Sequence, residues 1–286
     1  MRIIKTAIIA AAILSVIGSM FSCGDNSDSV IAAGSTSVQP YAEILAEKYM
    51  LLYPGSVIDV QGGGSSAGIE AAETGTADIG MSSRALTDDE NGRLWSVEIA
   101  KDGLAVIVNP KNPVKNLTLE QVRDIYANKI TDWSEVGGNN AKIHVITREE
   151  GSGTRSAFTD LIMDKQQITP KAIVQDSNGA VRQLVSSDPN SIGFISLGLV
   201  DKTIVKAVEL NGIEATAANV INGTYNFSRP FLFVSKGEPE GIAKQFIDFT
   251  LSPEGQQMLV NEGLISVAPD MSDTSIAPNI ETEGNK

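Results

Sequence analysis

Short apolar runs alternate along the chain with segments whose apolar residues recur at helical spacing. Residues 30–33 form such a run, and the apolar positions from Val38 to Leu52 then follow one helix face. The same order of strand and helix is repeated, with further elements predicted at residues 57–60, 69–73, 77–81 and 103–109. This alternation favours an α/β fold with a largely parallel sheet.

Two polar segments interrupt the pattern. Residues 109–113 contain two prolines and residues 222–228 are also polar, so each predicts a crossing between two lobes. Between the crossings, Thr118 and Gln121 form a capping box that opens a helix. The strands of this second unit are predicted at residues 142–147, 173–174, 192–196 and 204–208.

Two crossings mean that one lobe is built from both ends of the chain. We assign residues 30–109 and 226–269 to the first lobe and residues 110–225 to the second. The first lobe ends in a strand at residues 231–235 and two helices that begin at Pro239 and Pro253. Residues 270–286 have little apolar content, which predicts a disordered tail.

The N-terminus has the pattern of a secretion signal. Arg2 and Lys5 precede an apolar stretch that is shorter than the ~20 residues of a membrane-spanning helix, so residues 1–22 are predicted to be a signal peptide. Cys23 is the only cysteine, and its position resembles the lipobox of bacterial lipoproteins. We therefore expect residues 23–29 to be a lipidated tether at a membrane surface; the alternative is simple cleavage that leaves a free thiol.

Composition narrows the possible functions. The 286 residues are 42% hydrophobic and carry a formal net charge of -13, which argues against a nucleic-acid partner. Acidity does not argue against a small anion, because long-range charge is screened over about 8 Å at physiological salt. One histidine and one cysteine provide no zinc-type cluster, and no Walker A motif is present, so we expect no metal and no cofactor.

Three segments pair glycine with hydroxyl residues immediately before a predicted helix. The first contains Ser35, Thr36 and Ser37, with Ser37 as the expected N-cap, and the second is a glycine run that ends at Ser65. The free backbone N–H groups and dipole of a helix N-terminus favour an anion. Three such termini at one point would enclose a small tetrahedral oxyanion.

The third segment is the most informative. Arg148 ends a strand, a tight turn at Gly151, Ser152 and Gly153 follows, and Thr154 opens a helix. The planar guanidinium of arginine can hold two oxygens of one tetrahedral anion. Ser83 and Arg84 follow another predicted strand, where Arg84 is equally consistent with a surface charge and with a ligand.

A hydrolase is the alternative from a different class. Ser66 lies in a G-x-S-x-G pattern, which is typical of a nucleophile elbow. Such an enzyme needs a histidine base, and the only histidine, His144, lies in a segment that alternates like a strand. The pattern therefore favours binding without catalysis.

These segments together resemble the PstS-type phosphate-binding proteins of bacterial ABC phosphate importers, over about residues 30–269. The resemblance also includes the segments at residues 117–126, 130–138, 191–195 and 251–256. It implies a two-lobed type II periplasmic-binding-protein fold, each lobe a sheet flanked by helices, that closes on its ligand about a hinge formed by the two crossings.

The resemblance also implies roles for individual residues. Thr36, Ser37 and Ser65 would donate hydrogen bonds from the first lobe, and the opposite wall would be formed by Arg148, Ser152, Gly153 and Thr154. Better-known members have an aspartate that accepts a hydrogen bond from the protonated phosphate where this chain has Ser83. A serine hydroxyl can accept as well as donate, and Glu149 or Glu150 are other candidates for the acceptor.

We therefore expect a monomeric extracytoplasmic lipoprotein, not an enzyme, that binds inorganic phosphate and delivers it to an ABC permease and its ATPase. A receptor for sulfate, molybdate or tungstate is the nearest alternative. Two further alternatives are a secreted serine hydrolase that uses Ser66 and a surface receptor that senses or adheres.

Overall fold

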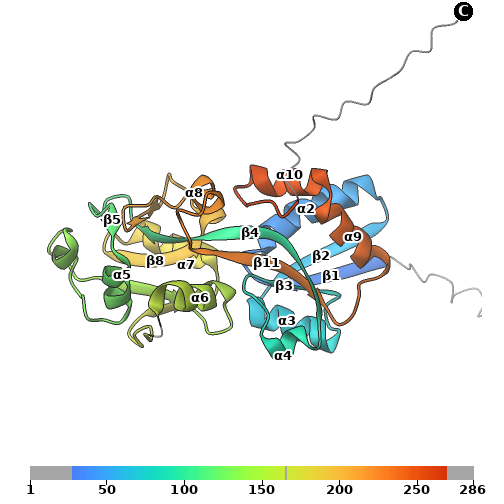
Figure 1. The fold of residues 1–286 in the computed structure, drawn as a ribbon, viewed down its shortest axis with the longest axis horizontal. Helices are drawn as coiled ribbons and strands as arrows, with labels where there is room; N and C mark the ends of the chain where they lie inside the picture. Colours follow the sequence, from blue (N-terminus) through green and yellow to red (C-terminus); the bar gives the residue numbers. More distant parts are fainter. Residues whose placement is uncertain (1–27, 165, 269–286) are drawn as a thin grey trace, which may run out of the picture.

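The computed structural model describes residues 28–164 and 166–268, and Figure 1 shows two lobes joined by two long strands. The predicted signal peptide, Cys23 with most of the predicted tether, and the predicted tail at residues 270–286 lie outside the described residues. Within the described part, a nine-stranded sheet runs through both lobes in the order β2-β1-β3-β11-β4-β8-β6-β7, with β9 beside β4.

The first lobe has an α/β arrangement around β1 (Asp28–Gly34), which lies parallel to its two neighbours β2 (Ser56–Gly62) and β3 (Ile79–Ser82). The strand β11 (Ser228–Ser235) then pairs antiparallel with both β3 and β4 (Trp95–Val108). Its helices are α2 (Gln39–Leu52), α3 (Ser65–Thr74), α4 (Asp88–Asn91), α9 (Gly241–Leu251) and α10 (Pro253–Asn261).

The second lobe repeats this arrangement around β6 (His144–Arg148), which lies parallel to β7 (Ile173–Gln175) and β8 (Ser191–Ser196). The short strands β5 (Asn116–Leu117) and β10 (Glu209–Leu210) pair with each other, and β9 (Lys206–Ala207) pairs with β4. The helical elements are α5 (Leu119–Tyr126), η1 (Trp133–Val136), α6 (Gly153–Phe158), η2 (Thr159–Met163), α7 (Asn178–Ser187), η3 (Leu197–Leu199) and α8 (Ala217–Ile221).

Each lobe has its own hydrophobic core. In the first lobe, Tyr49 packs on Phe246 and Phe249, and the core continues onto the inner face of the sheet. In the second, the rings of Phe158 and Phe194 stack with centroids 4.0 Å apart. Two separate cores on one continuous sheet confirm the predicted α/β type II architecture. Among helices of the described residues, none combines the length and apolar character that a membrane crossing requires.

The sheet differs from the expectation at the strands between the lobes. We expected a largely parallel sheet, but β4 and β11 run antiparallel to their neighbours, so the sheet is mixed. We also expected the first crossing at residues 109–113. In the structure β4 pairs with β11 up to Gly103 and with β8 from Leu104 onward, so β4 itself makes the crossing.

This correction moves part of the predicted first lobe. The residues from Leu104 to Val108 are fully buried in the core of the second lobe. Their apolar run predicted a strand correctly, but an apolar run does not show which of two cores it enters. The other lobe boundaries stay predictions.

Local signals at helix ends were mostly reliable. The capping box at Thr118 and Gln121 is present in full, and Ser252 caps α10 with Pro253 at its first position. Two details were wrong. The N-cap of α2 is Val38, since the Ser35 hydroxyl accepts the amides of Ser37 and Val38. The helix expected at Pro239 begins at Gly241.

An ion pair fastens the short helix α4 to the end of β3. The guanidinium of Arg84 donates to both carboxylate oxygens of Glu90, at 2.8 and 2.9 Å, and Glu90 also completes the capping box with Thr87. The hydrogen bond from Arg84 is the main cause that lowers the pKa of Glu90 to about 2. Arg84 is therefore engaged in the structure of its own lobe.

We predict that Glu90→Gln lowers stability at neutral pH by roughly 1–3 kcal/mol, from the size of the pKa shift. Because the pKa is depressed in the folded state, this contribution is present above the unfolded pKa of about 4.5 and is lost as the pH falls towards 2. Urea unfolding of the wild type and the variant over a pH series measures it. A stability difference that stays constant down to about pH 3 would contradict this assignment.

Candidate functional site

The three predicted glycine–hydroxyl segments meet at one place, between the lobes. β1 and β2 pair in parallel register from Asp28 and Ser56 to Gly34 and Gly62, so the loops that follow them lie side by side. The Gly64 amide donates to Gly34 O (2.9 Å). Across the lobes, the Ser66 amide donates to Gly151 O (3.1 Å), which belongs to the third segment, from Arg148 to Thr154.

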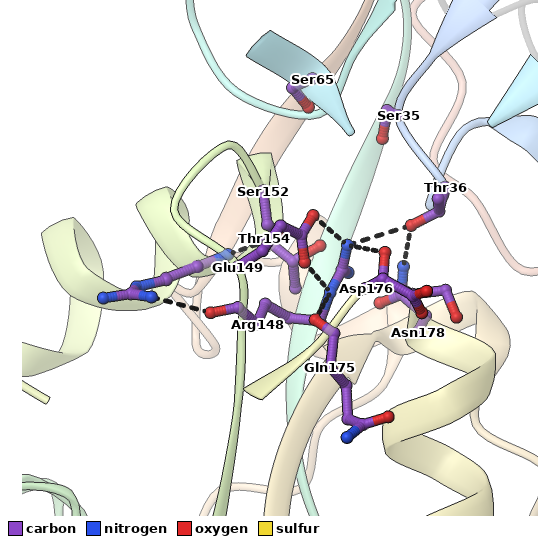
Figure 2. A network of polar contacts seen from close by, with 12 residues as sticks. Ser35, Thr36, Ser65, Arg148, Glu149, Ser152, Thr154, Gln175, Asp176 and Asn178 are labelled. Carbon is purple, nitrogen blue, oxygen red and sulfur yellow. Dashed lines mark hydrogen bonds and ion pairs between the residues drawn. The ribbon is translucent and has the colours of Figure 1, made fainter. Parts of the chain in front are cut away.

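Arg148 is the central cation of the site and is only 1% exposed. It ends β6, and Figure 2 shows its guanidinium reaching across to Thr36 of the first lobe. Its Nε and Nη2 donate to Glu149, to Gln175 O and Asp176 O, and to Thr36 Oγ1 (3.2 Å). Its Nη1 is buried and has no hydrogen-bond partner among the described residues. Buried donors are seldom left unpaired, so this nitrogen points to a ligand.

Hydroxyl groups from both lobes surround this point. Ser37 Oγ lies 2.9 Å from Thr154 Oγ1, and Asn178 Nδ2 donates to Ser37 Oγ (2.8 Å). Asn178 begins α7 and is within 3.5 Å of Thr36 Oγ1 as well (Figure 2). These contacts join residues more than a hundred positions apart in the sequence, and they bring Thr36, Ser37 and Thr154 together as predicted.

The second helix start contributes a pair of serines. The Ser83 amide donates to Ser65 Oγ (3.0 Å), and the two hydroxyl oxygens are 3.2 Å apart. Both serines are buried. Ser83 therefore lies at the site, where the family resemblance implies an acidic acceptor, and the hydroxyl pair can donate or accept a hydrogen bond.

Three of the predicted residues shape the site more than they offer free donors. Ser35 Oγ accepts two amides of its own turn, and Ser152 Oγ caps α6 by accepting the Arg155 amide (3.2 Å). Gly153 faces Ser65 and Ser83 so closely that a side chain there would overlap both. Backbone N–H groups at the start of α6 remain the donors of this segment.

Sequence reasoning missed three residues: Asn178, Arg229 and Asp102. Arg229 Nη2 donates to Ser37 Oγ (3.0 Å), while its Nε and Nη2 both donate to Asp102 Oδ2. The available signal was a charged residue just before a predicted strand: Asp102 precedes the strand predicted at residues 103–109, and Arg229 precedes the one predicted at residues 231–235. Asn178 gave no signal beyond following Ser177, the N-cap of α7.

The electrostatics of the site are balanced. Arg148 pairs with Glu149 (2.8 Å) and Arg229 with Asp102 (3.0 Å), so each guanidinium has one carboxylate. An added oxyanion would receive hydrogen bonds from hydroxyl, amide and guanidinium groups in a buried setting, where charge-assisted bonds are strong. The described residues form no group of three or more His, Cys, Asp or Glu that could hold a metal ion.

The hydrolase alternative receives no geometric support. Ser66 is exposed, and its amide bonds to Gly151 O. His144 Nδ1 is paired with Asp188 Oδ2 (2.6 Å) at the start of β6, while the site lies at the other end of this strand, roughly 13 Å away. The only histidine of the chain is therefore not placed as a base for Ser66.

Comparisons with known proteins agree with this geometry. The PBP superfamily domain matches residues 23–254. The phosphate-binding protein PstS of Bacillus subtilis is 32% identical over 246 residues, covering 84% of this chain and 81% of the relative. This chain belongs to the PstS family of phosphate-binding proteins.

Solved structures support the same family. A candidate phosphate ABC transporter substrate-binding protein of Clostridium perfringens, with bound phosphate, is 46% identical with a TM-score of 0.81, covering 84% of this PstS-family chain and 100% of the other. An ABC-type phosphate transport receptor of Vibrio cholerae is 42% identical with a TM-score of 0.69, over the same shares of the two chains.

Proposed function

We propose that this PstS-family protein binds inorganic phosphate between its lobes, outside the cytoplasmic membrane, and delivers it to an ABC permease. The observation that carries the proposal is the buried guanidinium of Arg148: its Nη1 has no protein partner among the described residues, while its Nη2 donates to Thr36 of the opposite lobe. The Clostridium perfringens relative with bound phosphate supports the choice of anion.

Binding uses many neutral donors and few charges. Each hydrogen bond to the charged ligand contributes roughly 1.5–3 kcal/mol, so a handful of donors is enough for tight binding. No bond is broken, because the donors stabilise the anion without activating a nucleophile. The lobes close around the ligand by bending at β4 and β11, the two strands that cross between them.

The location follows from the sequence. We propose that the chain acts as a monomer, tethered to a bacterial membrane by acylation of Cys23 after removal of the signal peptide. The partner in the membrane is an ABC permease with its ATPase. The naming of the Vibrio cholerae relative as an ABC-type phosphate transport receptor supports this partner.

Isothermal titration calorimetry with phosphate tests the proposal. After the protein has been stripped of endogenous ligand, we expect one phosphate to bind per chain with a dissociation constant of about 1 μM or lower, which corresponds to roughly 8 kcal/mol. Absence of a heat of binding at micromolar phosphate, in a protein that is folded by circular dichroism, would reject phosphate as the ligand.

Ser83 gives one specific reason to test other tetrahedral anions. A carboxylate would repel a fully ionised anion such as sulfate, whereas the Ser65–Ser83 pair can donate to it. Competition of sulfate, molybdate and tungstate against bound phosphate in the same titration decides between the candidates. If one of them displaces phosphate at equal concentration, that anion replaces phosphate as the proposed ligand.

A further inference from the structure

A second arginine lies beneath the anion site, on the strands that join the lobes. Arg229 of β11 and Asp102 of β4 are direct partners in the antiparallel register. Arg229 donates to Asp102 Oδ2 from Nε (3.2 Å) and Nη2 (3.0 Å), and Ser196 of the second lobe donates to Asp102 Oδ1 (2.8 Å). The exposed fractions of Arg229 and Asp102 are 4% and 1%.

Stability alone does not account for this pair. Burial raises the pKa of Asp102 and lowers the pKa of Arg229, and each charge partly offsets the shift of the other. Removing two charges from water costs about as much as their attraction returns, and apolar residues of similar size often serve equally well. The pair therefore calls for a role in which the charge of Arg229 or its donors are used.

Arg229 reaches two hydroxyls of the site. Its Nη2 donates to Ser37 Oγ (3.0 Å), and its Nη1 lies 3.4 Å from Ser83 Oγ. Asn178 Nδ2 donates to Ser37 Oγ from another side (2.8 Å). A hydroxyl has one hydrogen and two acceptor positions, and guanidinium and amide N–H groups can only donate. Both acceptor positions of Ser37 are thus filled, so its own hydrogen must be donated, and the acceptor within reach is Thr154 Oγ1 at 2.9 Å.

We propose that Arg229, held in place by Asp102, is a positioning residue of the anion site: it fixes the Ser37 hydroxyl as the donor to Thr154 Oγ1, which leaves the Thr154 hydrogen for the bound oxyanion, and it adds a second positive charge near that anion. This inference rests on the proposed phosphate binding. Thr154 Oγ1, which is 2.9 Å from Ser37 Oγ, belongs to the other wall of the same site.

A preference among protonation states of the ligand follows. A hydroxyl hydrogen directed at the ligand, next to a second cation, favours dibasic phosphate over the monobasic form, since the dibasic form has more charge and one less hydrogen to place. Wild-type affinity should therefore rise from about pH 6 to about pH 8, the range over which phosphate loses its second proton.

The test compares two variants with the wild type by phosphate calorimetry at both pH values. Asp102→Asn with Arg229→Gln removes both charges together, so no unpaired ion is left in the interior. Arg229→Lys keeps a cation opposite Asp102 but lacks the fork that reaches Ser37 and Ser83. Tyr225→Phe is the matched control, because it removes a buried hydrogen bond to Leu104 O at the same strand crossing without contacting the site.

We expect the double variant to bind phosphate about tenfold to a hundredfold more weakly, and Arg229→Lys about tenfold more weakly, which is the range for losing one charge-assisted contact. In both variants the ratio of dissociation constants at the two pH values falls towards one. Tyr225→Phe keeps the wild-type ratio.

Unchanged affinity and an unchanged pH ratio in either folded variant would overturn the role of Arg229. If the double variant does not fold, Arg229→Lys decides by the same two measurements. A loss of affinity with the pH ratio intact would show a structural role only and would also overturn the proposal. Failure of the wild type to bind phosphate would instead reject the proposed function, so the two failures are distinguishable.

Discussion

Arg148→Ala is expected to weaken phosphate binding about 100- to 1,000-fold, the effect of losing roughly 3–4 kcal/mol of charge-assisted hydrogen bonds. Arg148 is the only residue of the site whose buried guanidinium has an unpartnered nitrogen among the described residues. Its removal also leaves Glu149 without the cation that it pairs with, which adds an uncompensated negative charge beside the anion.

Titration calorimetry measures this loss, with Arg182→Ala as the control. Arg182 lies on α7 of the same lobe and donates to Leu199 O (2.9 Å), so its removal tests the loss of an arginine outside the site. We expect the control to bind phosphate as the wild type does. If Arg148→Ala binds phosphate as tightly as the wild type does, Arg148 is not a ligand-binding residue.

Gly153→Ala is expected to weaken phosphate binding by about 100-fold or more, because it prevents the two walls from approaching, and roughly 3 kcal/mol of ligand contacts depends on that approach. A Cβ at this position would lie 2.5 Å from Ser83 Oγ and 2.9 Å from the Ser83 carbonyl carbon, and would overlap Ser65 Oγ. The overlap with backbone cannot be relieved by turning a side chain.

The stability of the ligand-free protein should change little in this variant. Gly153 is the first residue of α6, and alanine is the better helix former when the lobes are apart. Gly151→Ala is the matched control in the same loop, since a Cβ there meets only Ser66, with Cβ at 3.6 Å and Oγ at 3.9 Å, which are ordinary contacts. Equal phosphate affinity in Gly153→Ala and the wild type would show that the walls do not close on this residue.

Local chemistry made the helix ends and the three glycine–hydroxyl segments predictable. The capping box of Thr118 and the Ser252–Pro253 start involve atoms within a few residues of one another, so sequence alone specifies them. The wrong N-cap at Ser37 shows the limit of such reasoning. In this turn Ser35 accepts the amides, and the Ser37 hydroxyl is used in contacts with Asn178, Thr154 and Arg229.

The crossing strand shows a second limit. Periodicity predicted residues 103–109 as a strand, but the start of β4 at Trp95 was missed. Residues 95–99 alternate apolar and polar side chains, which is itself typical of a strand, so the sequence did contain this signal. The change of partner at Gly103 and Leu104 depends on which strands compete for the same edge. No short-range pattern encodes that choice.

The sequence by itself determined the order of strands and helices, the glycine–hydroxyl segments at three helix starts, and Arg148 as the cation beside one of them. Each of these features depends on residues that are neighbours along the chain. Tertiary structure alone decided that Ser37 meets Thr154 across 117 positions and that Asp102 holds Arg229 across 127. Hydrogen bonds and burial act over a few ångströms in space regardless of sequence separation, so only the packed sheet could bring these groups to one point.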